Sequence, residues 1–212
     1  PTATPGTTTT HDLHTHGHGT DDHTEQDRGI SASGGIGAAE VTGHADMALL
    51  ALGTGLAAGL VLDGRVRRGA AGAAGEIGHL TYRADGPACA CGQRGCIEVY
   101  ASGAALDAAW PDPERPGPVA LFEAADAGDP QAVRVRDTFA DAVASAVRVL
   151  VLALDVEHVL LAGGVARLGE PLLRAVRDAV GRQAAASPFL ASLDLPGRLE
   201  LVPDAVPVGA VG

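Results

Sequence analysis

The chain has 212 residues, 46% of them hydrophobic, which is enough for one good-sized domain with a real core. Its formal net charge is -11 and all 15 basic residues are arginine, so we do not expect this segment to bind the phosphate backbone of nucleic acid. No run of about 18 apolar residues predicts a membrane span, and the start lacks the features of a signal peptide, so the default expectation is a cytoplasmic protein without membrane contact.

The first 24 residues differ in composition from the rest of the chain. They are rich in Thr, His, Gly and Asp, contain five of the eight histidines and lack hydrophobic periodicity, which predicts a disordered or irregular leader. Two alternatives stay open: a metal-binding tract of His14, His16 and His18, or a stretch outside the native reading frame. Residues 28–46 are rich in Gly and Ala, and their pattern is ambiguous.

Three consecutive strands are predicted for residues 47–68. The apolar run 47–52 ends in Gly53, Thr54 and Gly55, which predicts a buried strand and a tight turn. Residues 56–62 and 65–68 flank Asp63-Gly64, and Asp-Gly between two strand-like runs indicates a hairpin.

The rest of the chain is predicted to alternate helices and strands around a loop-rich stretch, 69–100. Asp129 and Pro130 have the residue types of an N-cap and a first helical position, so a long helix should begin there and end near Leu154. The other expected elements are helical pieces over 101–127, interrupted by Pro111 to Pro118, strands over 156–162 and 198–202, and a helix over 170–184. This order predicts an α/β domain with helices packed on a sheet.

A metal site is the sharpest chemical signal in the sequence. Three cysteines, Cys89, Cys91 and Cys96, follow His79 and are separated by glycines that let the backbone turn. Three thiolates and one imidazole close a tetrahedral zinc shell, so the ion would be structural rather than catalytic. The alternative is three unligated buried cysteines and a core histidine.

Two glutamates and two glycine turns are candidate binding residues because of their positions in the sequence. Glu76 and Glu98 lie within three residues of proposed zinc ligands, where a rigid loop would hold carboxylates as acceptors for the hydroxyls of a polyol, although solvated surface glutamates are the alternative. The Gly-Thr-Gly turn follows a strand and could approach phosphate, and the pair Gly163-Gly164 follows another strand and could approach a ligand or a helix. Each is a weak signal when taken alone.

Together these motifs resemble the ROK sugar kinases (repressor, open reading frame, kinase), in family order over about residues 47–212. The matching strings are LGTGLAAGLVLDG (52–64), AAGEIGH (73–79), CACGQRGCIEVYASG (89–103) and LLAGGVA (160–166). The resemblance implies the C-terminal lobe of an actin-like, hexokinase-like (ribonuclease H-like) ATPase with a zinc loop at 76–98, preceded by a poorly matching leader and interlobe remnant at 1–46. It also implies a cytoplasmic enzyme that is often a homo-oligomer.

The resemblance implies a role for each matched residue. His79, Cys89, Cys91 and Cys96 would bind structural Zn²⁺, and Glu76, His79 and Glu98 would contact the sugar. Gly53, Thr54 and Gly55 would approach the phosphates of ATP, which acts with Mg²⁺, and Gly163 and Gly164 would approach the adenosine.

Other parts of the family pattern are altered or absent. Counting back from the Gly-Thr-Gly turn places the catalytic base at Asp27, with Asp21 and Asp22 as weaker candidates; Gln26 stands where Asn is more frequent, and a glycine-rich stretch replaces the usual helix. The N-terminal phosphate signature, an Asp followed shortly by Gly-Gly-Thr, does not occur in these 212 residues. The chain is therefore expected to lack the N-terminal lobe and to be a fragment or a disrupted member.

Three functions follow from these observations. The first is ATP-dependent phosphorylation of a hexose or N-acylhexosamine, impaired in this chain alone. The second is a sugar-responsive transcriptional regulator of the same family, and the third is a zinc-stabilised sugar-binding remnant without catalysis.

Overall fold

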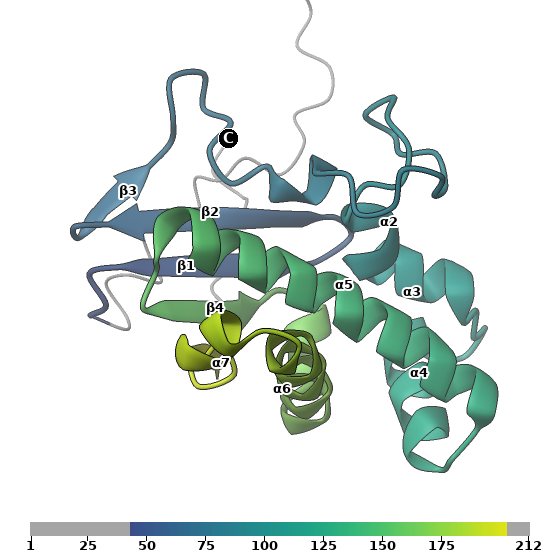
Figure 1. Cartoon of the computed structure of the whole chain (residues 1–212). Helices are drawn as coiled ribbons and strands as arrows, with labels where there is room; N and C mark the ends of the chain where they lie inside the picture. Colours follow the sequence, from purple (N-terminus) through teal and green to yellow (C-terminus); the bar gives the residue numbers. More distant parts are fainter. Residues whose placement is uncertain (1–42, 203–212) are drawn as a thin grey trace, which may run out of the picture.

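A computed structural model describes residues 43–202, which form one five-stranded sheet in the order β3-β2-β1-β4-β5 with helices packed against it (Figure 1). The first three strands are β1 (Met47–Leu52), β2 (Leu56–Leu62) and β3 (Arg65–Arg67), joined as an antiparallel meander. Asp63 and Gly64, between β2 and β3, both have positive φ angles, 53° and 69°, as the predicted Asp-Gly hairpin requires. The three predicted strands are confirmed.

Two more strands extend the sheet on its other side. β4 (His158–Ala162) pairs parallel with β1, and β5 (Leu199–Leu201) pairs parallel with β4. Both strands were predicted. The predicted range began two residues before β4, and it extended one residue beyond β5 at each end. Because β1, β4 and β5 are parallel, their carboxyl ends meet at one edge of the sheet.

The long helix α5 (Pro130–Leu154) begins and ends where the sequence predicts. The carboxylate of Asp129 accepts hydrogen bonds from the backbone N–H groups of Gln131 (2.7 Å) and Ala132 (2.9 Å), which are two donors that the first turn leaves unpaired. At the other end, Asp155 adopts a left-handed conformation with a φ of 50°, which stops the helix.

The remaining helices connect and cover the sheet. They are η2 (Ile77–His79), α2 (Glu98–Ala101), α3 (Gly103–Ala109), α4 (Gly117–Asp126), η3 (Val165–Leu168), α6 (Glu170–Ala185) and α7 (Pro188–Ser192). The predicted interruption from Pro111 to Pro118 extends two residues too far, since Gly117 and Pro118 form the start of α4, where proline needs no hydrogen-bond partner.

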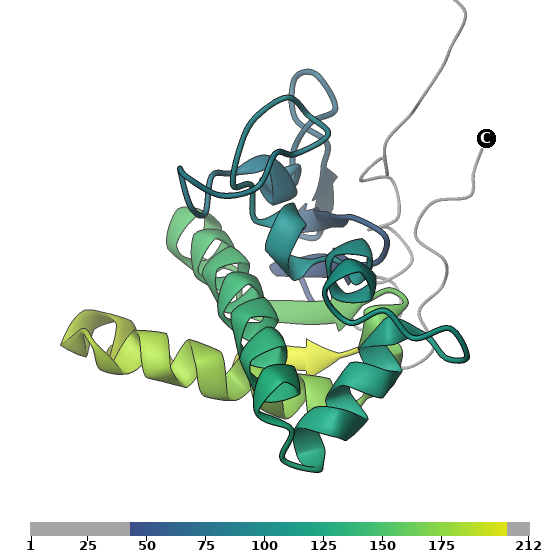
Figure 2. The ribbon, with the colours of Figure 1, turned by 90° about the vertical axis from the view of Figure 1, so that its right-hand side faces the viewer.

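The core lies between the sheet and the helices. One face of the sheet packs against the helices (Figures 1 and 2). Phe139 of α5 and Leu161 of β4 are both buried in the core on this face. The opposite face carries a second, smaller buried cluster of Met47, Leu49, Val61, Leu160 and Ala162. Among residues 43–202, no helix is both long enough and apolar enough to cross a membrane.

Candidate functional site

The segment that follows β3 returns across β2 and packs on it through two glycines. Gly75 has a φ of +98°, its carbonyl accepts a hydrogen bond from the N–H of Ala58 (2.8 Å), and a Cβ atom at Gly75 would lie 1.7 Å from the Ala58 carbonyl oxygen. A Cβ atom at Gly78 would lie 2.1 Å from the carbonyl oxygen of Leu56. Only glycine permits these approaches, so the segment that carries Glu76 and His79 is held directly against the start of β2.

The cysteine loop, residues 80–97, is shaped by backbone hydrogen bonds rather than by regular structure. The N–H of Cys89 donates to the carbonyl of Gln93 (2.8 Å), and Gly92 closes the turn with a bond to the carbonyl of Cys89 (3.0 Å). An isolated bridge pairs Thr81 with Cys96. These bonds bring three cysteines of one short loop around the histidine that precedes it.

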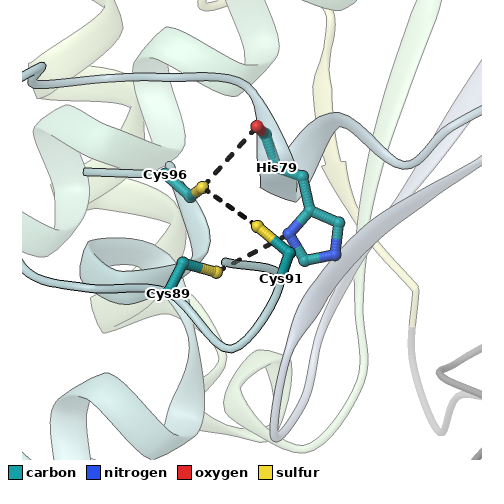
Figure 3. A group of neighbouring side chains, drawn as sticks. All are labelled: His79, Cys89, Cys91 and Cys96. Carbon is teal, nitrogen blue, oxygen red and sulfur yellow. Dashed lines mark hydrogen bonds between the residues drawn. The ribbon is translucent and has the colours of Figure 1, made fainter. Parts of the chain in front are cut away.

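Four potential ligand atoms converge at this point (Figure 3). The Sγ atoms of Cys91 and Cys96 are 3.7 Å apart, the Sγ of Cys89 is 3.8 Å from the Nδ1 of His79, and all four atoms lie within 4.8 Å of one another. A disulfide would need a sulfur–sulfur distance of about 2.05 Å. Tetrahedral zinc places its sulfur ligands about 3.8 Å apart and a sulfur and a nitrogen about 3.6 Å apart. The residues therefore fit zinc, and the predicted ligands are brought together.

Two of these thiols differ in acidity. A hydrogen bond from the backbone of Gln93 lowers the pKa of the exposed Cys91 thiol to about 7, with further help from the neighbouring Cys89 and Cys96. Burial raises the pKa of the Cys96 thiol to about 12, and the adjacent Cys91 and Cys89 add to that rise. Since thiolates are the metal ligands, a cation bound here must displace the proton that Cys96 otherwise retains.

The imidazole of His79 presents its two nitrogens to different surroundings. Nδ1 faces the sulfur atoms, and Nε2 lies on the far side of the ring (Figure 3). The carbonyl of the same residue accepts hydrogen bonds from the side-chain amide of Gln93 (3.2 Å) and from the Sγ of Cys96 (3.6 Å), which fix the backbone that carries the ring. A ligand can therefore be met by Nε2 while Nδ1 coordinates a metal.

The two predicted glutamates lie next to this cluster on different elements. Glu98 begins α2, is half-buried, and its Oε2 accepts a hydrogen bond from the backbone N–H of Leu56 at 2.9 Å. Glu76 is half-buried and immediately precedes η2, which contacts both β2 and α2. The bond from Leu56 to Glu98 was not predicted, because it joins residues 42 positions apart.

Both glycine turns lie at the carboxyl edge of the parallel strands. Ala51 of β1 is in register with Ala162 of β4, so the Gly-Thr-Gly turn and Gly163-Gly164 leave the sheet side by side. Gly163 has a φ of +89°, and a Cβ atom there would lie 2.6 Å from the carbonyl oxygen of Leu52. The edge of an α/β sheet where parallel strands end is a common place for ligands to bind.

Comparison with known proteins decides the family. A sequence profile of the ROK family matches residues 28–194.

This chain belongs to the ROK family.

Curated relatives of the ROK chain are sugar kinases. The glucokinase of Thermotoga maritima is 34% identical over 154 residues, which are 65% of this chain and 49% of that protein. The N-acetylmannosamine kinase of Vibrio cholerae is 36% identical over 137 residues, which are 64% of this chain and 47% of that protein. The ROK chain therefore spans about half the length of the curated relatives that it matches.

Solved structures of the family share the fold. The ROK hexokinase of Thermus thermophilus is 38% identical with a TM-score of 0.62, covering 74% of this chain and 54% of that one. A ROK glucokinase from Streptomyces griseus, in complex with glucose and AMPPNP, is 31% identical with a TM-score of 0.60, covering 72% and 55% of the two chains. A ROK transcriptional regulator, described as a homologue of the E. coli MLC protein, is 26% identical with a TM-score of 0.63, covering 82% and 46%.

Some predicted residues of the ROK chain lie outside the described range of 43–202. They are the proposed base Asp27, its alternatives Asp21 and Asp22, and the histidine tract of His14, His16 and His18.

One cluster that the sequence did not predict also brings metal-ligating groups together. His44, His158 and Glu200 each place a potential ligand atom within 4.8 Å of the others. No motif could have indicated it, since its members are separated by more than 40 residues at each step.

Proposed function

We propose that this ROK chain is part of a sugar kinase that transfers the γ-phosphoryl group of ATP to a hydroxyl of a hexose or N-acylhexosamine. The hydrogen bond between Glu98 and the N–H of Leu56 carries the proposal. Leu56 directly follows the Gly-Thr-Gly turn, and Glu98 directly follows the cysteine loop. A single hydrogen bond thus links a carboxylate suited to a sugar, Glu98, to the residue that follows a turn suited to phosphates.

The sugar side of the proposed site is formed by Glu76, His79 and Glu98. Zinc on Nδ1 would fix the His79 ring and leave Nε2 toward a sugar hydroxyl. The two carboxylates would accept hydrogen bonds from further hydroxyls. Zinc itself would be structural, because the three cysteines and His79 close its shell.

The phosphate side is proposed at the carboxyl edge of β1 and β4. The exposed Thr54 hydroxyl and the turn of Gly53 and Gly55, which the bond from the N–H of Gly53 to the carbonyl of Gly55 (3.1 Å) shapes, would meet the phosphates of ATP, and Gly163 and Gly164 would meet its adenosine. Bound Mg²⁺ would neutralise charge on the transferred phosphoryl group. This division is supported by the register that sets the two turns side by side.

We assign proton transfer to Asp27 on the strength of the family pattern. The sugar oxygen forms a bond to the γ-phosphorus as the bond from that phosphorus to the bridging oxygen of ADP breaks. The carboxylate of Asp27 accepts the proton that the hydroxyl loses, and ADP leaves with the bridging oxygen.

We further propose residues 47–212 as the C-terminal ATPase and sugar-binding lobe and 1–46 as a leader with an interlobe remnant. Catalysis of phosphoryl transfer depends mainly on positioning. Since the Asp and Gly-Gly-Thr phosphate signature does not occur in these 212 residues, they should phosphorylate sugar poorly by themselves. Robust sugar-dependent release of ADP by the purified 212-residue chain would contradict this.

The binding half of the proposal is tested by calorimetry on the zinc-loaded chain with glucose and N-acetylmannosamine. We expect heat from at least one sugar, and Glu98→Ala should abolish it. Glu98→Gln separates the two tasks of this residue, since its amide oxygen can still accept from Leu56 while the charge is lost. Glu114→Gln changes an exposed glutamate outside the proposed site and is the matched control. Sugar heat that survives Glu98→Ala would refute the assignment of the sugar site.

A second function, a sugar-responsive regulator, rests on one observation. The ROK family also contains transcriptional regulators, and the structure of one of them covers 82% of this chain with a TM-score of 0.63. Binding of sugar with no phosphoryl transfer, even when the full-length gene product is assayed, would support the regulator. Failure of that product to bind ATP, while it still binds sugar, would leave the non-catalytic sugar-binding remnant.

A further inference from the structure

A second cluster of metal-ligating side chains lies on the face of the sheet that carries the smaller apolar cluster. His158 begins β4 on the same side as Leu160 and Ala162, and Glu200 of β5 projects from the corresponding side. His44 reaches the same place from the residues that lead into β1. The side chains of His44, His158 and Glu200 are 25%, 23% and 42% exposed, so a cation from solvent can reach them.

The three side chains are held by different parts of the backbone. β4 and β5 pair in parallel register, with Leu160 opposite Glu200. The carbonyl of Asp46, two residues after His44, accepts hydrogen bonds from the N–H groups of Glu157 (3.0 Å) and His158 (3.4 Å). The carboxylate of Asp46 also accepts from the N–H of Asp63 at 2.9 Å. The cluster is therefore built on anchored backbone.

Distances between the polar atoms are close to those of a bound ion. Nδ1 of His158 is 2.6 Å from one oxygen of Glu200, and Nε2 of His44 is 3.7 Å from the other oxygen. An ion of zinc type separates an imidazole nitrogen and a carboxylate oxygen by about 3.4 Å. The two observed distances therefore lie within about 1 Å of that spacing.

The imidazoles of His44 and His158 are stacked, with centroids 3.5 Å apart and planes inclined by 18°. A metal lies in the plane of each imidazole that binds it, so two stacked rings cannot share one ion. One ring must rotate out of the stack, and His44 is the freer of the two because it precedes β1.

We propose that His44, His158 and Glu200 form a second metal site, specific for a divalent transition metal of the zinc, nickel and cobalt group. Two imidazoles and one carboxylate suit these ions better than Mg²⁺ or Ca²⁺, which prefer oxygen. Three protein ligands leave coordination positions for water, so this site exchanges its ion more readily than the closed cysteine site. A bound ion links the residues that precede β1 to strands β4 and β5. The proposal does not depend on the proposed kinase function.

The test uses Co²⁺ titration of the full chain after one equivalent of Zn²⁺ has filled the cysteine site. We expect one further ion per chain, with weak cobalt bands and without the intense charge-transfer absorption of a cobalt–thiolate bond. His158→Ala and Glu200→Gln should each weaken this second binding by at least about 10-fold, since even outer-shell changes cost that much at metal sites. An unchanged circular-dichroism spectrum and unfolding midpoint show that each variant remains folded.

Two controls distinguish other sources of binding. The leader variant His14→Ala/His16→Ala/His18→Ala should keep the second equivalent, and Glu170→Gln, at an exposed glutamate on α6, should leave it unchanged. The proposal is overturned if no second equivalent binds, or if it survives both site variants and disappears only in the leader variant.

Discussion

Two regions of this ROK chain are held together by different physical means. The body of sheet and helices buries large apolar side chains such as Phe139 and Leu161. In the cysteine loop, by contrast, the buried apolar side chains are Cys89, Cys96 and Ile97. Hydrophobic burial stabilises the first region, and the second depends on turn hydrogen bonds, close glycine packing and, on our proposal, zinc. A substitution in the core of the body should therefore destabilise the whole fold, whereas removal of zinc should affect mainly the loop.

The largest effect should come from the body. Phe139→Ala removes a side chain that is 1% exposed on α5 and should lower the free energy of unfolding by about 3–5 kcal/mol. Urea unfolding followed by circular dichroism measures this loss. Leu152→Ala, on the same helix but 46% exposed, is the matched control and should change stability by less than about 1 kcal/mol. Equal effects of the two variants would contradict the packing described here.

Removal of zinc should affect the cysteine loop far more than the body. Chelation leaves the loop with little apolar support, so backbone amides of residues 80–97 should lose protection from hydrogen exchange while those of β1, β4 and α5 keep theirs. Cys91→Ser should have the same effect without a chelator. Loss of protection throughout the chain would show that the two regions are not separate.

Two glycine substitutions should change stability in opposite directions. Gly78→Ala forces a Cβ atom toward the backbone oxygen of Leu56, now 2.1 Å from that position, and should cost about 1–3 kcal/mol. Gly181→Ala lies within α6, where the nearest atom would be 3.9 Å away, and should stabilise by about 0.5–1 kcal/mol. Thermal unfolding of both variants gives the comparison, and a stabilising Gly78→Ala would contradict the close packing on β2.

The smallest effect concerns thiol reactivity in the metal-free chain. With a pKa of about 7, Cys91 is largely thiolate at pH 8 and should be alkylated first, and its rate should fall as the pH drops through 7. Cys96, buried and with a pKa of about 12, should react last. Mass spectrometry after brief iodoacetamide treatment measures the order. Reaction of Cys96 before Cys91 would contradict the described loop.

Local sequence patterns predicted most of the body. Asp129 and Pro130 indicated the start of α5, and Asp63-Gly64 indicated the β2–β3 hairpin, because each effect acts within a few residues. The parallel pairing of β1 with β4 was not predicted, since it joins segments more than 100 residues apart and depends on tertiary packing.

In the candidate site, too, local features were predicted from sequence and long-range contacts were not. The convergence of four potential ligand atoms was predicted because His79 and the three cysteines lie within one short stretch of sequence. The bond from Leu56 to Glu98 and the cluster of His44, His158 and Glu200 arise only when distant strands and loops come together. Neither has a spacing that a sequence pattern could reveal.

X-ray absorption at the zinc edge, on the chain loaded with one equivalent of Zn²⁺, tests the central claim most directly. The account predicts three sulfur ligands at about 2.3 Å and one nitrogen at about 2.0–2.1 Å, with the sulfur shell reduced in Cys91→Ser. A shell of nitrogen and oxygen alone, or no bound zinc, would contradict a thiolate centre that holds His79 and Glu98 in place.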